Sequence, residues 1–317
     1  MVTPVRLGLI GAGRWGRNYI RTIAGLEGVR LARVASRNPD TAVPSKCMVM
    51  PDWRALLDNR EIDGAIIATP PALHAEMARA AVEAGLPVLV EKPLTLDLGE
   101  AIALREFVAG HGGFVMVDHL HLFHPAYRAL KGLASKYGPV LAIRSEAGNW
   151  GPFRPDAPVL WDWGSHDVAM CIDFLDTVPE GVDAHCVERR PVEGALGEFI
   201  ELKLRFPGTL QADIRLGNMM PKRRRFAAHF ETGVLVYDDL ATNKLTLHPS
   251  TARYVLPEGA GQRVEITPEL PLGNLIADFA AAIRDRNRDL SALDLGVSVV
   301  ETLGRCAAAL GAEYRPR

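Results

Sequence analysis

The chain has 317 residues, of which 48% are hydrophobic and 23% charged, a composition typical of a globular protein large enough for two domains. Its formal net charge of −2 argues against a nucleic-acid or anionic-membrane partner. The four cysteines have no zinc-type spacing, and no stretch approaches the roughly 18 apolar residues that a membrane span needs. We therefore expect a soluble cytoplasmic protein with reduced thiols.

The first 120 residues alternate short apolar runs with amphipathic segments. Strands are predicted within 5–13, 29–36, 63–71, 87–93 and 114–123, and helices within 14–27, 53–62, 73–86 and 98–113. Strands separated by helices imply right-handed βαβ crossovers and a parallel sheet with helices on both faces. The sequence therefore predicts a doubly wound α/β domain over residues 1–122.

The pattern changes after about residue 125. Runs typical of β-strands cover 140–150, 197–206, 209–219, 224–232 and 233–239, and helices are predicted at 163–175, 275–286 and 295–310. Alternating apolar and polar residues in several of these runs are expected of an antiparallel sheet with one exposed face. We predict an α+β domain over residues 123–317 with a large, mostly antiparallel open sheet. One face of that sheet is a candidate interface for a homodimer or homotetramer.

Gly11, Gly13 and Gly16 form a GxGxxG pattern, with Arg14 and Trp15 inside it, between a predicted strand and a predicted helix. The first glycine permits a tight turn, the second lets the backbone approach a pyrophosphate, and the third lets helix and strand pack closely. The helix N-terminus adds free N–H groups and the positive end of a dipole. The pattern predicts the Rossmann phosphate site of a dinucleotide; the alternative is a tight turn without a ligand.

The second predicted strand ends in Ser36 and Arg37 rather than in an acidic residue. A carboxylate at this position accepts the ribose 2′-OH of NAD, whereas a hydroxyl beside a guanidinium suits the 2′-phosphate of NADP. The sequence therefore favours NADP over NAD. The choice stays open, because Arg37 alternatively lies over the adenine or points into water.

The apolar run 86–90 ends abruptly in Glu91, Lys92 and Pro93. Ligands of a doubly wound sheet bind outside the carboxyl ends of its strands, so these residues are placed near a bound nicotinamide. Lys92 is a candidate to donate a hydrogen bond to the substrate oxygen and favour its alkoxide as hydride leaves. Glu91 is a candidate to orient Lys92 or to contact the cofactor. The alternative is a strand that simply ends in a charged turn.

The segment "IIATPPALHAEMARAAVEAGLPVLVEKPLTLDLGEA" resembles the central signature of the glucose–fructose oxidoreductase/inositol dehydrogenase (Gfo/Idh/MocA) family, which runs from a Thr-Pro turn through a His to Glu-Lys-Pro. Its separation from the glycine motif also matches that family. The resemblance implies that Thr69 and Pro70 line the nicotinamide pocket, that His74 belongs to the cofactor-binding segment, and that Lys92 is catalytic.

Asp162 and His166 lie four residues apart in "LWDWGSHDVAM" and share one face if the segment is helical. A histidine near its ordinary pKa accepts a hydroxyl proton at neutral pH. The family resemblance implies that His166 is the general acid–base, with Asp162 as its companion and Lys92 nearby. The alternative is a capping aspartate and a packed histidine, and Asp167 is expected to serve structure.

Three further segments, 117–132, 149–167 and 221–239, resemble a branch of the family with sugar and nucleotide-sugar dehydrogenases. The chain departs from that branch at Trp163, where a small or apolar residue is frequent, and at Asp118, where glycine is frequent. These departures put the identity of the substrate in doubt more than the type of reaction.

His119, His121 and His124 form an HxHxxH pattern that superficially resembles a metal site. In a strand His119 and His121 would share a face, but the sequence offers no acidic or histidine partner at ligand spacing. We expect no metal here and a pocket-lining or packing role instead. His119 is nearest the predicted site and is a candidate to bind substrate.

The Gly- and Pro-rich stretch before the Asp162 segment is predicted to be a loop. Asn149, Trp150 and Arg154 in this stretch are candidates for the substrate pocket, although a loop aromatic also packs under its own loop. The basic run 222–225 either clamps a substrate phosphate or carboxylate or forms a solvated face.

Together these patterns predict an NAD(P)-dependent oxidoreductase acting on a secondary alcohol or ketone of a sugar, cyclitol or nucleotide sugar. One alternative is an NAD-dependent glycosidase or an aldose–aldose oxidoreductase with tightly bound cofactor. A second is a non-catalytic dinucleotide-sensing protein. The presence of Lys92, Asp162 and His166 argues against a sensor, which needs only the phosphate-binding half of the chain.

Overall fold

The computed structural model describes residues 3–58, 60–153, 158–250 and 253–314. The chain divides into two compact units. The first consists of Met1–Leu120 together with Leu270–Val300, and the second of His121–Glu269 together with Glu301–Arg317.

The first unit contains a parallel sheet. Its strands are β1 (Val5–Ile10), β2 (Val29–Ala35), β3 (Met48–Met50), β4 (Gly64–Ile67), β5 (Val88–Glu91) and β6 (Val115–Asp118). They lie in the order β3-β2-β1-β4-β5-β6, and each neighbouring pair is parallel. Every residue of β4, β5 and β6 is buried, as expected for strands that are covered on both faces. The predicted doubly wound sheet is confirmed.

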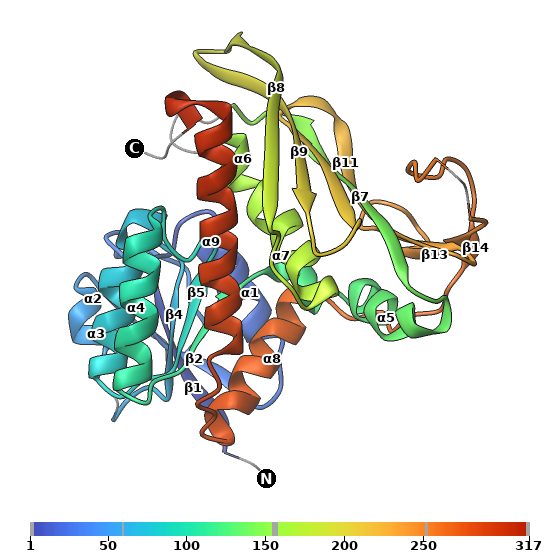
Figure 1. Ribbon diagram of the computed structural model, residues 1–317. Helices are drawn as coiled ribbons and strands as arrows, with labels where there is room; N and C mark the ends of the chain where they lie inside the picture. The colour runs from blue at the N-terminus through green and yellow to red at the C-terminus, as the bar shows by residue number, and fades with distance from the viewer. Residues whose placement is uncertain (1–2, 59, 154–157, 251–252, 315–317) are drawn as a thin grey trace. The chain divides into compact units, whose positions relative to one another are not determined.

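Helices cover both faces of this sheet (Figure 1). On one face lie α2 (Trp53–Leu56), α3 (His74–Glu83) and α4 (Leu98–Gly110), and on the other α1 (Gly16–Ala24) and α8 (Pro271–Arg284). A 3₁₀ turn, η1 (Pro71–Leu73), leads into α3. Asp52 and Asp97 cap α2 and α4, since each carboxylate accepts a backbone N–H at 2.9 Å.

Helix α8 and the first part of α9 (Ser291–Leu310) belong to the first unit, although the sequence placed everything after residue 122 in a second domain. Phe279 of α8 stacks on Phe114 with ring centroids 6.4 Å apart. Gly64 of β4 makes room for this helix, because a Cβ there would lie 2.6 Å from Cδ1 of Ile283. The apolar face of α8 therefore completes the core of the parallel sheet.

The second unit contains a large mixed sheet. Its strands are β7 (Val140–Trp150), β8 (Gly181–Val192), β9 (Ala195–Arg205), β10 (Gln211–Gly217), β11 (Met219–Phe230), β12 (Val234–Asp238), β13 (Leu245–His248) and β14 (Gln262–Arg263). Their order is β14-β13-β12-β11-β7-β10-β9-β8. The β7–β10 pair is parallel and the other pairs are antiparallel, so the predicted, mostly antiparallel sheet is confirmed.

One face of this sheet packs against helices. They are α5 (Pro125–Leu133), α6 (Val159–Asp162) and α7 (Gly164–Leu175), and three 3₁₀ turns accompany them: η2 (Leu120–Phe123), η3 (Ala134–Lys136) and η4 (Ala312–Tyr314). Phe226 of β11 meets Tyr127 of α5 and Phe174 of α7 edge to face, each with centroids 5.9 Å apart. This aromatic cluster fixes α5 and α7 on the sheet.

The opposite face of the sheet carries ion pairs between neighbouring strands. Arg144 of β7 meets Asp213 of β10 at 3.1 Å, and Arg215 of β10 meets Glu201 of β9 at 3.0 Å. These pairs follow the alternation that the sequence predicted for a sheet with one polar face. A homodimer or homotetramer through this sheet stays a prediction.

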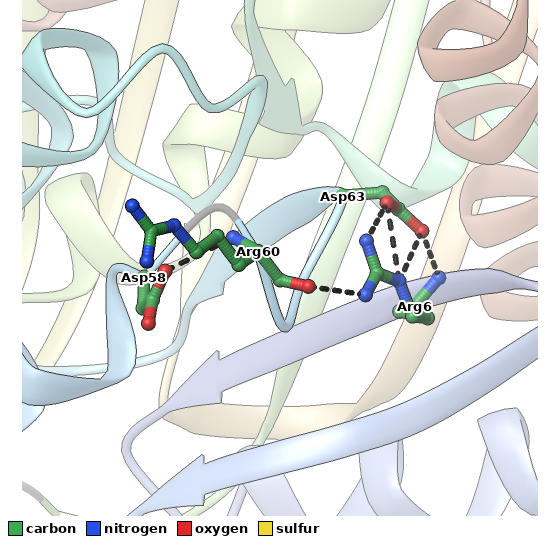
Figure 2. Close-up of polar contacts among 4 residues, drawn as sticks. All are labelled: Arg6, Asp58, Arg60 and Asp63. Atoms are coloured by element: carbon green, nitrogen blue, oxygen red, sulfur yellow. Dashed lines mark hydrogen bonds and ion pairs between the residues drawn. The ribbon is translucent and has the colours of Figure 1, made fainter.

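The amino ends of β1 and β4 are joined by Arg6 and Asp63 (Figure 2). The Asp63 carboxylate accepts the Arg6 backbone N–H at 2.7 Å and the guanidinium Nη2 at 2.6 Å. Arg6 also donates to the Arg60 carbonyl at 2.5 Å, and Asp58 accepts the Arg60 N–H at 3.0 Å. Burial alone would raise the pKa of Asp63, but the hydrogen bonds and charge of Arg6 outweigh it and hold that pKa below its ordinary value.

We expect Asp63→Asn to lower the free energy of unfolding by about 1–2 kcal/mol at pH 7, because it removes a charge-assisted, forked pair at a partly exposed site. Since the pKa of Asp63 is lower in the folded than in the unfolded chain, its contribution is lost as the pH falls below about 4. Urea unfolding at pH 7 and at pH 3.5 measures both effects. Asp58→Asn, in the same turn, is the control, and an equal loss in the two variants would contradict this account.

Candidate functional site

The turn between β1 and α1 leaves one backbone position open. Gly11 has φ +96°, and a Cβ there would lie 2.6 Å from the Ala68 carbonyl oxygen. A Cβ on Gly16 would lie 2.0 Å from the Gly11 oxygen, so both positions require glycine. A Cβ on Gly13, by contrast, would meet no described atom within 4 Å, and no side chain caps the α1 N-terminus. The turn therefore fits a pyrophosphate approaching Gly13 and the helix N-terminus.

The residues predicted to surround this turn lie at the same edge of the sheet. Gly11 N–H donates to the Ala35 carbonyl at 3.0 Å, which brings the ends of β1 and β2 together. Ser36 Oγ accepts the Asn38 N–H at 3.2 Å, and Arg37 is exposed beside it. Arg14 and Trp15 are also exposed, where α1 begins.

His74 joins the segments that follow β4 and β5. Its side chain is fully buried, with Nε2 2.9 Å from the Thr69 carbonyl oxygen and Nδ1 2.9 Å from that of Pro93. Burial lowers the pKa of His74, although both carbonyl groups favour its protonated form. His74 is thus a buried link between the Thr69–Pro70 turn and the segment after Lys92, rather than a group on the surface of the sheet edge.

Lys92 is half-buried at the end of β5, and its charge acts on the buried groups around it. Its ammonium attracts the carboxyl groups of Glu91 and Asp118. Burial, and then the Lys92 charge, lower the pKa of His119 to about 3. His119 is 2% exposed, and neither of its ring nitrogens has a hydrogen-bond partner in the described part of the chain. The sheet edge therefore collects the predicted cofactor residues together with Lys92 and His119.

In the second unit, Asp162 ends α6 and His166 lies in the first turn of α7. The His166 N–H donates to the Trp163 carbonyl at 3.0 Å, so the chain stays helical between them, as the four-residue spacing predicts. The start of α6 is anchored by Glu198, whose Oε2 accepts the Val159 N–H at 3.1 Å. The side chains of Asp162 and His166 are both half-buried.

His121 lies against His166, with the two rings edge to face and their centroids 5.0 Å apart. His121 Nδ1 is also 2.8 Å from the Tyr237 hydroxyl of β12. Burial raises the pKa of Tyr237 well above its ordinary value, so the phenol keeps its proton. The second unit therefore places the His121 ring between the His166 ring, which it contacts edge to face, and the Tyr237 hydroxyl, which lies within hydrogen-bonding distance.

The strand expected to carry His119 and His121 on one face ends at Asp118. Residues Leu120–Phe123 form the 3₁₀ turn η2 instead, so the expectation of a shared face is wrong. His124 caps α5, since its Nδ1 accepts the Ala126 N–H at 3.0 Å. Among the described residues, no group of three or more His, Cys, Asp or Glu side chains is arranged to hold a metal ion.

Arg224 connects the basic run to the His166 segment. Its guanidinium lies 3.8 Å from the centre of a Trp163 ring and donates to the Gly148 carbonyl at 2.9 Å. The carboxylates of Asp162 and Asp167 attract it. Asp167 is itself buried and accepts the Ser145 hydroxyl, and burial raises its pKa to about 6, which agrees with its predicted structural role.

Asn149 and Trp150 end strand β7, which confirms the strand predicted over 140–150, whereas the expectation that these two residues lie in a loop is wrong. Asn149 is half-buried, and Trp150 is 59% exposed and meets Phe153 edge to face at 5.8 Å. The aromatic pair matches the alternative in which Trp150 packs against its own segment. Arg154 lies outside the described residues.

Comparison with known proteins places the chain in a family. Residues 5–119 match the GFO_IDH_MocA model, described as an oxidoreductase family with an NAD-binding Rossmann fold. A solved structure from Magnetospirillum magnetotacticum, described as a "putative oxidoreductase", is 48% identical, with 96% of this chain and 100% of that chain covered and a TM-score of 0.91. The chain belongs to the Gfo/Idh/MocA oxidoreductase family.

Two groups of relatives agree with the predicted branch of the Gfo/Idh/MocA family. UDP-N-acetylglucosamine 3-dehydrogenase of Acidithiobacillus ferrooxidans is 33% identical over 190 residues, or 58% of each chain. A solved structure of that enzyme has a TM-score of 0.83 and 25% identity, over 99% of this chain and 100% of that one. Inositol 2-dehydrogenase 2 of Saccharopolyspora erythraea is 30% identical over 196 residues, again 58% of each. The chain thus spans less than two thirds of the curated relatives that it matches.

Two polar residues of this family member escaped the sequence prediction. Tyr237 stood in a strand pattern with no chemical signal, and its link to His121 depends on which strands are neighbours. Arg224 belonged to a basic run whose role was left open, and period-2 alternation from the buried Phe226 would have placed it on the helix-covered face.

No helix of the described chain is both long and apolar enough to cross a membrane.

We expect His74→Ala to lower the free energy of unfolding by about 2–4 kcal/mol, because it leaves a cavity and removes the ring that lies between the Thr69 and Pro93 carbonyl groups. Amide hydrogen exchange should rise at Thr69, Lys92, Leu94 and Thr95, in the two segments that the imidazole now joins. His111→Ala, at the exposed end of α4, is the matched control. Unchanged exchange in both segments would rule out His74 as their link.

Proposed function

We propose that this protein is an NAD(P)-dependent oxidoreductase that transfers a hydride between nicotinamide and a secondary alcohol or ketone of a sugar, cyclitol or nucleotide sugar. One observation carries the proposal: the half-buried residue Lys92 directly follows strand β5 of the parallel sheet, and the first turn of that sheet leaves Gly13 open to a pyrophosphate. The names of two relatives, a UDP-N-acetylglucosamine dehydrogenase and an inositol dehydrogenase, support the substrate class.

The first unit holds the cofactor in this proposal. The open backbone at Gly13 and the α1 N-terminus bind the pyrophosphate, and the Thr69–Pro70 turn lines the nicotinamide pocket. A bound nicotinamide supplies hydride acceptance or donation at its C4. Lys92 donates a hydrogen bond to the substrate oxygen and stabilises the negative charge that develops there.

The second unit supplies the proton acceptor. His166 takes the hydroxyl proton of the alcohol, and reduction of a ketone reverses this step. Asp162 is proposed to orient the imidazole. The His121 ring packs against His166 edge to face, and its Nδ1 lies 2.8 Å from the Tyr237 hydroxyl, so both polar groups are proposed to tune the surroundings of the His166 imidazole.

Arg224, stacked on Trp163, is proposed to bind a negatively charged or polyhydroxylated part of the substrate. Asn149, Trp150 and Arg154 of the second unit and His119 of the first stay candidates to bind substrate. The active form is proposed to be a cytoplasmic homodimer or homotetramer assembled through the sheet of the second unit.

The proposed cofactor is NADP in preference to NAD. The segment after β2 presents Ser36 and the exposed residue Arg37. A carboxylate at this place would repel the 2′-phosphate of NADP, whereas a guanidinium attracts it. The Ser36 hydroxyl is already fixed in its turn by the Asn38 N–H.

Lys92→Ala is expected to reduce kcat by at least about 100-fold, because it removes a donor aimed at the developing oxyanion. The cofactor-induced rise in melting temperature should persist, since the phosphate site is untouched. Turnover is assayed by nicotinamide absorbance with nucleotide sugars and free polyols, and by product analysis. Lys136→Ala, an exposed lysine in the second unit, is the control.

Three outcomes would contradict the proposal. Full activity in Lys92→Ala would remove the proposed role of the amine. Turnover without net change of nicotinamide would favour the glycosidase or aldose–aldose oxidoreductase. The absence of any melting shift with NAD or NADP at millimolar concentration would exclude dinucleotide binding.

Arg37→Ala is expected to weaken NADP binding by roughly tenfold and to leave NAD binding nearly unchanged, because only NADP offers a 2′-phosphate to the guanidinium. Calorimetric titration of both dinucleotides measures this difference. Arg30→Ala, which changes an exposed arginine on β2 itself, serves as the control. Equal weakening of both dinucleotides by Arg37→Ala would place Arg37 at the adenine instead.

A further inference from the structure

Two acidic side chains lie next to one another beneath Lys92. Glu91 is the last residue of β5 and Asp118 the last of β6, and the two are register partners in parallel strands. Glu91 is 7% exposed and Asp118 is 1% exposed. The end of the sheet therefore buries two carboxyl groups side by side.

A tyrosine from α1 completes this cluster. The Tyr19 hydroxyl, which is also buried, donates to Asp118 Oδ2 at 2.5 Å. The carboxyl groups of Glu91 and Asp118 are within hydrogen-bonding reach of each other. Taken as two carboxylates, each leaves one buried oxygen, Glu91 Oε1 and Asp118 Oδ1, without a partner among the described residues. Two acceptors can bond to each other only if a proton lies between them.

Burial makes two neighbouring negative charges unfavourable, so the first proton is retained. Burial, followed by the charge of Asp118, raises the pKa of Glu91 well above its ordinary value. Burial also raises the pKa of Asp118, but the hydrogen bonds from Glu91 and Tyr19 oppose this shift. The pair therefore keeps one proton and carries one negative charge, much as other buried carboxyl pairs share one proton.

We propose that Glu91 and Asp118 hold one proton between them, and that the single negative charge left on this buried pair positions the Lys92 ammonium. The positioning of Lys92 rests on the proposed function, whereas the sharing of a proton by Glu91 and Asp118 does not. Glu91 and Asp118 are positioning residues here, since they act through Lys92.

The groups that face the pair are few within the described chain. Tyr19 faces it from α1, Lys92 from the end of β5, and Lys92 in turn acts on His119 after β6. Burial raises the pKa of Tyr19 well above its ordinary value, and the two acids raise it further, so Tyr19 stays a donor. With His119 neutral, the local charge is one ammonium opposite one shared-proton pair.

The test uses three variants, Glu91→Gln, Asp118→Asn and the double variant, which keep the size of each side chain. Each single variant retains one carboxyl group and hence one negative charge, whereas the double variant retains none. Proton sharing ends in all three variants, but the counter-charge of Lys92 disappears only in the double variant. The two halves of the proposal therefore predict different patterns.

The first readout is stability against pH. Above about pH 4.3 an unfolded glutamate loses its proton, while the folded chain keeps one proton on the Glu91–Asp118 pair. The folded state then binds more protons, so this pair makes stability fall as the pH rises. We expect the melting temperature of each single variant to fall less steeply between pH 5 and pH 8 than that of the wild type. The difference in slope should correspond to at most one fewer proton released on unfolding. The pH slope of the double variant should differ little from that of the single variants. A slope of melting temperature against pH that is identical to the wild type in both single variants would overturn proton sharing.

The second readout is turnover. Single variants should lose about tenfold or less in kcat, whereas the double variant should lose about 100-fold with KM little changed. Equal losses of kcat in the single and double variants, or a loss expressed in KM rather than in kcat, would overturn the positioning role.

Folding and function are separated by the design. The melting curves show whether each variant folds. If the double variant does not fold, the single variants alone decide whether the proton is shared. A wild-type protein without turnover would remove the proposed function and the positioning role together, while the pH slopes would still decide whether the proton is shared.

Discussion

Parallel pairing of the strands in the first unit is the constraint on which the candidate site depends. The register of a parallel sheet brings the carboxyl ends of its strands to one edge, so the residue that follows each strand is placed by backbone hydrogen bonds alone. Gly11, Ser36, Thr69, Lys92 and Asp118 reach that edge from five strands that are far apart in the sequence. The buried imidazole of His74 then ties the Thr69–Pro70 turn to the segment after Lys92.

The second unit builds its polar cluster differently. Its sheet is held to α7 by aromatic packing and by the buried Ser145–Asp167 hydrogen bond. His166 then stands at the helix start, while Arg224 and Tyr237 arrive from the neighbouring strands β11 and β12. Burial keeps Tyr237 a phenol, and carboxylates surround the Arg224 guanidinium. The cluster therefore combines an imidazole, a phenol and a guanidinium that neighbouring carboxylates attract.

Local sequence patterns predicted most of the helices and strands, whereas contacts between residues far apart in the sequence decided where strands end and which elements pack together. Apolar runs and the glycine motif were sufficient for the doubly wound sheet, since both follow from a few adjacent residues. Strand β8 was missed because most of its residues are partly or fully exposed, which leaves little apolar alternation. The strand end at Asp118, the membership of α8 in the first unit and the pairing of Glu91 with Asp118 all depend on contacts that no local window contains. Asp118 was visible in the sequence only as a departure from a frequent glycine.

The most direct test of this account is a crystal structure of the protein with NADP⁺. We expect the pyrophosphate against the Gly13 backbone and the α1 N-terminus, the 2′-phosphate beside Ser36 and Arg37, and the nicotinamide next to Lys92. A dinucleotide bound away from the carboxyl edge of the parallel sheet, or a nicotinamide out of reach of the Lys92 amine, would contradict it.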